Sequence, residues 1–163
     1  MPDLREKLGG APHSKQSLRL WLRLLSCATV IEKRLRTRLA REFHTTLPRF
    51  DVLAALERHP DGLTMGELSH ALMVSNGNVT GVANRLLADG LIEREVDARD
   101  RRTFRVRLSR KGREEFATMA KVHEGWVDDM FADLTNEEIE TLMEQLIRVR
   151  RSVAQSEKRA ADA

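Results

Sequence analysis

The sequence has few of the residues and patterns on which several classes of protein depend. Cys27 is the single cysteine among 163 residues, which excludes an internal disulfide and a cysteine-rich zinc site. No apolar run approaches the roughly 18 residues of a membrane-spanning helix, and no signal peptide is recognisable, so we expect a cytoplasmic protein. HExxH, GxSxG and glycine-rich phosphate-loop motifs are absent, and no two histidines stand four positions apart. We therefore expect no enzyme activity, no metal and no cofactor.

What the sequence does have is an uneven distribution of charge. The net charge is only +3, but residues 94–113 hold nine Arg or Lys against three acids. Residues 114–144 hold one Lys against ten acids. A local excess of positive charge suits contact with a polyanion. A charge run is more often a solvated face, but this one lies on a predicted hairpin, which favours contact.

Apolar periodicity predicts a mainly helical (α+β) chain with long helices near both ends. The first runs from about Ser14 to Phe43, and a second opens at Leu47-Pro48 and stops before Pro60. A capping box at residues 135–138 opens the last helix. Its apolar residues follow a strict 3-4-3-4 repeat: Ile139, Leu142, Leu146, Val149 and Val153.

The centre of the chain predicts a winged helix-turn-helix with a two-stranded wing. A capping box at residues 64–67 opens a short helix, and a second helix runs from Asn76 to about Ala88. Residues 91–96 and 103–108 then read as short strands, joined by six residues that include three arginines. Such a unit places its second helix in the DNA major groove, which is about 12 Å wide.

The predicted DNA contacts lie on the second helix and the wing. The outward face of the helix carries short hydrogen-bonding side chains, and wing arginines suit a narrow minor groove. Ser75 is also expected to cap this helix, and the strand arginines Arg105 and Arg107 are expected to lie mainly on solvent. Asp97 and Asp100 are expected to pair with neighbouring arginines and shape the wing. The predicted DNA-binding residues are Ser75, Asn76, Asn78, Thr80, Asn84, Arg85, Arg99, Arg101 and Arg102.

A winged helix reads only a few base pairs, so tight binding requires two copies on two half-sites. The apolar stripes of the end helices could supply a dimer interface, the alternative being that they complete a monomeric core. We expect a mobile N-terminal arm at 1–13, a helical dimerisation region at 14–46 and 109–155, a winged helix-turn-helix at 47–108 and a frayed tail at 156–163.

Residues 63–112 resemble the MarR family of bacterial transcription regulators. The resemblance implies a homodimer on pseudo-palindromic double-stranded operator DNA, usually a repressor, with an effector pocket between the dimerisation helices and the winged region. Element order matches over about residues 14–155. The motifs that carry the resemblance are the helix Ser75–Leu87, DGLIER at Asp89–Arg94, DxxDRR at Asp97–Arg102, LSRKG at Leu108–Gly112 and LTNEE at Leu134–Glu138.

The same resemblance implies a small-molecule effector, because many relatives respond to aromatic acids or lipophilic phenols and some to aromatic acyl-CoA thioesters; we expect a small anionic aromatic ligand, such as an aromatic acid or its CoA thioester. The SNGNVTG start of the second helix looks like that of regulators of aromatic acid catabolism. Arg36 and Arg38 are candidate counter-charges for such a ligand, although a solvated helix face would explain them too. His44, in the following turn, is a candidate lining residue.

The sequence is also compatible with two other functions. Some relatives sense oxidants through a cysteine on the first helix with tyrosines nearby, but this chain has no Tyr, so we expect Cys27 to be packed rather than redox-sensing. Trp21 and Trp126 are likewise expected in the core. A winged helix can also serve as a protein-interaction module without a DNA role, though the arginine-tipped wing speaks against that reading.

Overall fold

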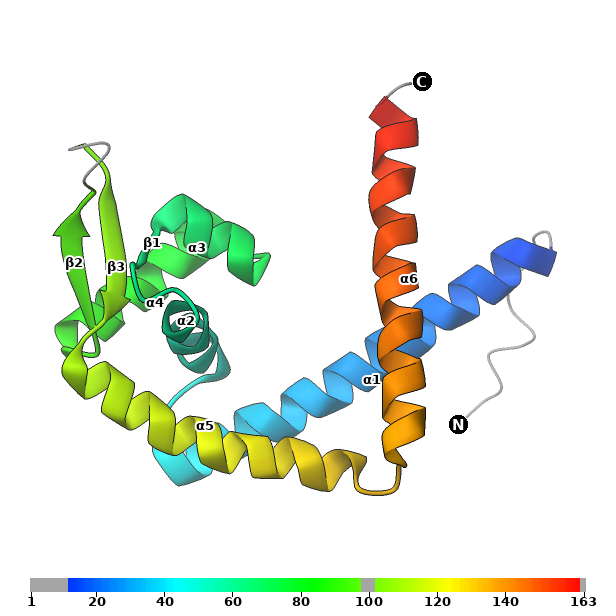
Figure 1. Cartoon of the computed structure of the whole chain (residues 1–163), viewed down its shortest axis with the longest axis horizontal. Helices are drawn as coiled ribbons and strands as arrows, with labels where there is room; N and C mark the ends of the chain where they lie inside the picture. The colour runs from blue at the N-terminus through cyan, green and yellow to red at the C-terminus, as the bar shows by residue number, and fades with distance from the viewer. Residues whose placement is uncertain (1–11, 98–101, 162–163) are drawn as a thin grey trace. The chain divides into compact units, whose positions relative to one another are not determined.

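The computed structural model describes residues 12–97 and 102–161 (Figure 1). The chain divides into two compact units, one ending at His123 and the other beginning at Glu124. As predicted, the fold is mainly helical with a small antiparallel sheet. The elements are α1 (Pro12–Phe43), α2 (Leu47–Glu57), β1 (Leu63–Thr64), α3 (Met65–Leu72), α4 (Asn76–Ala88), β2 (Ile92–Val96), β3 (Phe104–Leu108), α5 (Arg110–Phe131) and α6 (Asn136–Ala161). We call residues 47–108, from α2 to β3, the head.

Local sequence signals explain where several helices begin. Both predicted capping boxes are present: Thr64 Oγ1 accepts the Glu67 amide at 3.2 Å, and Glu67 Oε2 accepts the Thr64 amide at 2.8 Å. Thr135 and Glu138 repeat the arrangement at the start of α6. Hydrogen bonds from the threonine amides lower the pKa of both glutamates. Each box satisfies helix amides that otherwise lack partners.

The turn between α2 and β1 requires glycine at its last position. Gly62 has a φ of 77°, in the left-handed region. A Cβ built there would lie 2.7 Å from the Val106 carbonyl oxygen. Both the backbone conformation and the close approach of β3 therefore exclude a side chain, which fixes where the sheet meets the end of α2.

The three strands pair in the order β1-β3-β2, all antiparallel. Ile92 faces Leu108, Arg94 faces Val106 and Val96 faces Phe104 across the β2–β3 hairpin. Because side chains alternate along a strand, the face that carries Ile92, Val106 and Leu108 is buried, while Glu93, Glu95, Arg105 and Arg107 share the opposite face. The alternation of Phe104, Val106 and Leu108 with two arginines along β3 is the sequence signal of this orientation.

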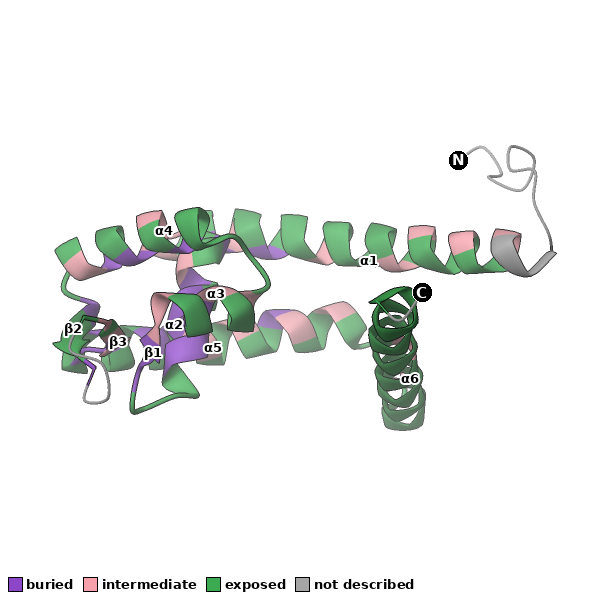
Figure 2. Cartoon of the chain, turned by 90° about the horizontal axis from the view of Figure 1, so that it is seen from above, coloured by how far each residue is buried: buried purple, intermediate pink, exposed green. Residues whose placement is uncertain are grey.

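The hydrophobic core lies in the head and in the part of α1 next to it. Figure 2 shows buried residues on α2 and α4, whereas no residue of α6 is buried. The ring of Phe50 stacks on His123 at 4.4 Å and lies 5.4 Å from Phe116, so α5 packs on α2. The largest fully buried side chains are Leu39, Leu53, Leu56, Leu68, Leu86, Val52 and Val79.

Several predictions about the helices outside the head were wrong for the single chain. Trp21 is 56% exposed and Cys27 is exposed, although both were expected to be packed, whereas Trp126 is buried as expected. The physical reason is that most of the apolar stripe of α1 has nothing packed against it within its own unit. Helix α1 begins at Pro12, and α6 continues past Ser156, where a frayed tail was expected. Residues 1–11 of the expected arm at 1–13 lie outside the described residues.

Among the described helices, none is both long and apolar enough to span a membrane.

Candidate nucleic-acid interface

Helix α4 presents a polar outer face whose residues match the predicted DNA contacts. Thr80 Oγ1 donates to the Asn76 carbonyl at 2.8 Å, so its hydrogen is engaged within the helix. Ser75 occupies the N-cap position in an extended conformation, but its side chain makes no capping hydrogen bond, contrary to expectation. The exposed predicted residues on or next to α4 are Ser75, Asn76, Asn78, Thr80, Asn84 and Arg85.

One face of the wing hairpin is neutralised by ion pairs. Arg107 Nη2 lies 2.5 Å from Glu95 Oε1 and 3.3 Å from Glu93 Oε2. Arg105 Nη1 lies 2.9 Å from Asp97 Oδ2. These strand arginines, expected mainly on solvent, keep part of their side chains exposed (28% for Arg105 and 41% for Arg107), and each pairs with a carboxylate of β2 or of the residue that follows it. The predicted pairing of Asp97 with an arginine is present, and its partner comes from β3 rather than from the loop.

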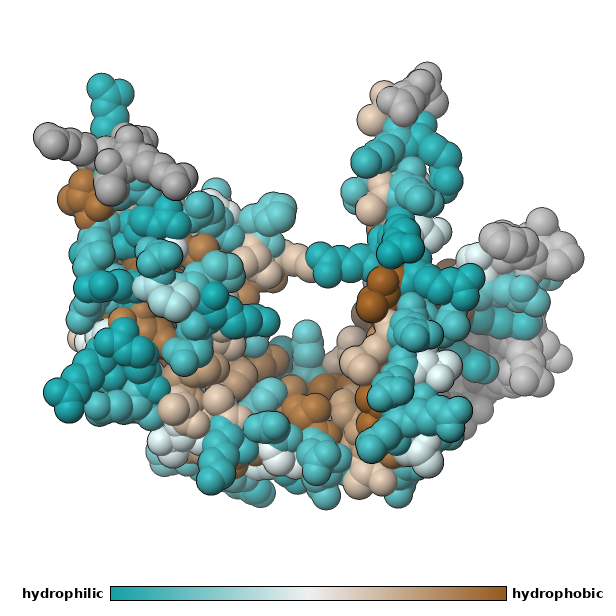
Figure 3. All heavy atoms as spheres, viewed as in Figure 1, coloured by the Kyte–Doolittle hydropathy of each residue, from teal (hydrophilic) through white to brown (hydrophobic). Residues whose placement is uncertain are grey.

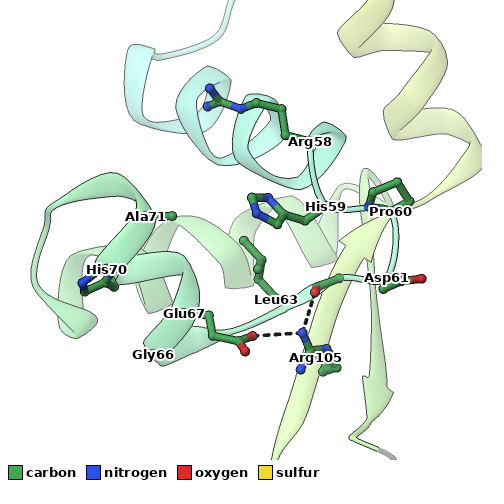
Figure 4. A pocket seen from close by; sticks show the side chains of 11 residues that line it. Arg58, His59, Pro60, Asp61, Leu63, Gly66, Glu67, His70, Ala71 and Arg105 are labelled. Carbon is green, nitrogen blue, oxygen red and sulfur yellow. Dashed lines mark hydrogen bonds and ion pairs between the residues drawn. The ribbon is translucent and has the colours of Figure 1, made fainter. Parts of the chain in front are cut away.

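Arg105 connects three parts of the head, and Figure 4 shows two of these contacts, to Glu67 and to the α2–β1 turn. Its Nη2 donates to the Gly62 carbonyl at 2.8 Å and lies 3.0 Å from Glu67 Oε2, while Nη1 reaches the buried Asp97. The hydrogen bond to Asp97 raises the pKa of Arg105 above its ordinary value. Arg105 therefore links Glu67, in the capping box of α3, to Asp97 at the end of β2 and to the α2–β1 turn. These contacts set the position of the wing hairpin relative to the helices.

A groove of about 520 Å³ separates α4 from the other face of the hairpin; we call it the wing groove. It brings together Thr80, Asn84 and Arg102 from the predicted DNA-binding set. Within the groove the Arg94 guanidinium carbon lies 3.7 Å from the centre of the Phe104 ring. Arg94 was not among the predicted contacts, because the sequence shows only that it stands on the strand that follows the second helix. Arg99, Asp100 and Arg101 lie outside the described residues.

A second cavity, of about 590 Å³, lies on the opposite flank of α4 and is called the head pocket. Helices α1, α2 and α4 each contribute one arginine to it: Arg36, Arg49 and Arg85. Arg49 also pairs with Asp89 at 2.5 Å. Loss of solvation, and to a lesser extent Glu32, raises the pKa of the lining Asp51. Apolar lining residues include Val52, Val79 and Val82.

Of the three predicted effector residues, the structure places only Arg36 in the head pocket. Arg38 lines a separate, shallow depression on α1, and His44 is exposed and lines none of the described cavities. Residues two apart on a helix point about 200° apart, so Arg36 and Arg38 cannot face one pocket. Arg49 and Arg85 were missed as ligand candidates because no local pattern reveals that α1, α2 and α4 meet there.

Comparison with known proteins finds clear similarity. The MarR family model matches residues 45–103. The transcriptional activatory protein BadR of Rhodopseudomonas palustris is 34% identical over 125 residues, which cover 74% of this chain and 71% of BadR. A MarR family transcriptional regulator from Silicibacter pomeroyi superposes with a TM-score of 0.75 at 30% identity, covering 88% of this chain and 99% of that one. A variant of E. coli MarR in complex with operator DNA gives 0.73 at 24% identity, covering 82% and 95%.

Proposed function

This chain belongs to the MarR family of DNA-binding transcriptional regulators, and on that premise we propose that it is a homodimeric repressor released from its operator by a small anionic aromatic ligand. One observation carries the DNA-binding part: the exposed polar face of α4 and the wing hairpin stand side by side on one head (Figure 1). The E. coli MarR variant solved with operator DNA shares this fold. We propose that the DNA contacts are the nine predicted residues: Ser75, Asn76, Asn78, Thr80, Asn84, Arg85, Arg99, Arg101 and Arg102.

The DNA-binding proposal is tested by titrating the protein against DNA upstream of its own gene. Affinity should fall steeply with salt, because phosphate contacts release counterions. Asn84→Ala should reduce discrimination between operator and random DNA, and Arg102→Ala should weaken binding to both, each without changing the unfolding midpoint. Failure of the wild-type protein to retain any DNA would instead favour a protein-interaction module.

The homodimer proposal is supported by apolar side chains that nothing covers within their own unit. Leu142, Leu146 and Val153 of α6 are 49–55% exposed, and apolar atoms are visible at the surface over this helix (Figure 3). A regular apolar row on a solvent-exposed helix is typical of a helix–helix interface. Sedimentation should give twice the monomer mass, and a chain that remains monomeric at working concentration would refute the dimer.

The effector proposal is supported by the composition of the head pocket. Its volume lies in the usual range for small-molecule sites, roughly 300–1,000 Å³. Its three arginines suit a carboxylate, and its valines suit a ring. A single-ring acid would be enclosed, whereas the CoA part of a thioester would extend outside. Because Arg85 and Asn78 also belong to the proposed DNA contacts, an occupied pocket would compete for them.

The effector site is tested by calorimetry with benzoate and with an aromatic acyl-CoA. Arg85→Gln should weaken binding, and Asp51→Asn should tighten it because a carboxylate that opposes an anion is removed. For the same reason, wild-type affinity should rise as pH falls through the raised pKa of Asp51. A ligand that binds equally to both variants and to wild type would place the effector elsewhere.

Two observations favour alternatives within the same family. The name of BadR describes an activatory protein, so in vitro transcription assays should test for activation as well as repression. Cys27 is exposed, which makes it accessible to oxidants. If peroxide releases the wild-type protein from DNA and Cys27→Ser remains bound, the protein is a redox-sensing repressor rather than a ligand-responsive one.

A further inference from the structure

The two faces of the wing hairpin differ in how their positive charge is compensated. On one face, Arg105 and Arg107 are held by Asp97, Glu93 and Glu95 at 2.5–3.3 Å. On the other face, Arg94 forms no ion pair with any described residue, and its recorded contact is the Phe104 ring. A guanidinium left without a carboxylate attracts an anion more strongly than a paired one. The uncompensated charge of the described strands therefore faces the wing groove.

The contact with Phe104 fixes the orientation of the Arg94 side chain. Phe104 lies diagonally across the hairpin, because Arg94 is opposite Val106 and Phe104 is opposite Val96. With its carbon 3.7 Å from the ring centre, the guanidinium rests on the aromatic face. No described residue accepts a hydrogen bond from the N–H donors of this guanidinium. An arginine so placed presents a preformed, planar fork of donors, which suits the oxygens of a phosphate.

The remaining walls of the wing groove fit the same ligand. Asn84 of α4 supplies an amide, and the lining also includes Arg102 and Thr103 at the tip of the hairpin. Phe104, which lines the groove, is 39% exposed, whereas the apolar residues Ile92, Val106 and Leu108 on the same face of the hairpin are buried. Apolar side chains beside a phosphate site can lie against the sugars of a nucleic acid strand. Among the described residues that line this groove, none is acidic.

We infer that the wing groove holds one backbone phosphate of double-stranded DNA, with Arg94 as the residue that binds it and Phe104 as the platform that orients Arg94. The inference rests on the proposed DNA-binding function and adds to it a residue and a contact type. Since phosphate carries no base identity, the contact sets the register of the wing on the DNA without reading sequence. A phosphate held there would place the DNA backbone between α4 and the wing, so that α4 contacts one groove of the DNA and the wing contacts the neighbouring groove.

The inference is tested by DNA titrations over a range of salt concentrations with wild type, Arg94→Gln, Arg94→Lys and Phe104→Leu. Arg94→Gln should weaken operator and random DNA about equally and lower the slope of log affinity against log salt by about one per head. Arg94→Lys should keep the slope but not the full affinity, because the charge remains and the planar fork is lost. Phe104→Leu should fall between wild type and Arg94→Gln. Lys121→Gln, which removes an exposed charge on α5, is the control and should match wild type.

A second measurement locates the contact on the DNA. Single phosphates of the operator are replaced in turn by neutral methylphosphonates. One position in each half-site should weaken the wild type and leave Arg94→Gln unaffected. An Arg94→Gln variant with wild-type affinity and salt slope, or one that loses only operator discrimination, would overturn the phosphate assignment. Failure of the wild type itself to bind DNA would refute the proposed function instead, so the two failures are distinguishable.

Discussion

The head and α6 have equally regular apolar patterns, but the apolar side chains are buried in the head and exposed on α6. Leu53, Leu56 and Leu86 in the head are no more than 1% exposed, whereas Leu142 and Leu146 of α6 are about half exposed. Periodicity alone predicts that a helix has an apolar face, but not which surface covers it. The head closes its core with elements of its own unit, whereas nothing within its own unit covers the apolar row of α6.

The largest expected effect comes from opening the core of the head. Leu86 has no exposed surface, and Leu86→Ala should destabilise the protein by about 2–5 kcal/mol, through lost burial and the cavity left behind. Chemical denaturation of wild type and variant measures this. The effect should not depend on protein concentration. Leu142→Ala is the control: a loss of similar size there, independent of concentration, would mean that α6 is packed within its own chain.

The next effect tests the exposed row of α6 directly. Leu146→Glu should leave the head folded and convert the dimer to monomer, because a carboxylate cannot be buried in an apolar interface without a partner. Operator affinity should then fall by roughly 10²-fold or more, since two linked heads bind far more tightly than one. Sedimentation and DNA titration on the same sample measure both quantities. A dimeric variant with full affinity would show that the row lies outside the interface.

A smaller effect is expected from Arg105, which acts inside the head without facing DNA. Arg105→Ala removes one ion pair of the buried Asp97 and frees the base of the wing hairpin from Glu67 and Gly62. We expect operator affinity to fall by roughly tenfold, the size of one lost specific contact. Asp97→Asn should reproduce much of the loss. A positioning role, unlike a DNA contact, should leave the salt dependence of binding unchanged, so an altered slope would contradict it.

The smallest effect is a pH dependence built into the packing of α5 on α2. Burial lowers the pKa of His123 below its ordinary 6.5, so the folded chain binds this proton less readily than the unfolded chain. Its contribution to stability is therefore present above about pH 6.5 and is lost as pH falls towards the lower folded-state pKa. His123→Phe keeps a ring against Phe50 and removes the titration. Unfolding midpoints at pH 7.5 and 5.5 should differ less in this variant than in wild type; an equal difference would assign the dependence to other groups.

Most of the fold could be predicted because its signals are local. Capping boxes at Thr64 and Thr135, a proline in the first turn of α2, and the alternation along β3 each act within a few residues of chain. The polar face of α4 followed from its outward positions in the same way. The expected burial of Trp21 and Cys27 failed, because it depended on a covering surface that no local pattern specifies.

The sequence by itself determined which segments are helices and strands, which faces are apolar and where positive charge concentrates, since these depend on neighbours three or four positions away. Only the tertiary structure decided that Arg36, Arg49 and Arg85 meet in one pocket and that Arg105 turns inward to Asp97. It alone placed Arg94 on Phe104 beside α4. The reason is physical: the partner of a charged side chain depends on which elements pack together, and that packing joins residues far apart in the chain.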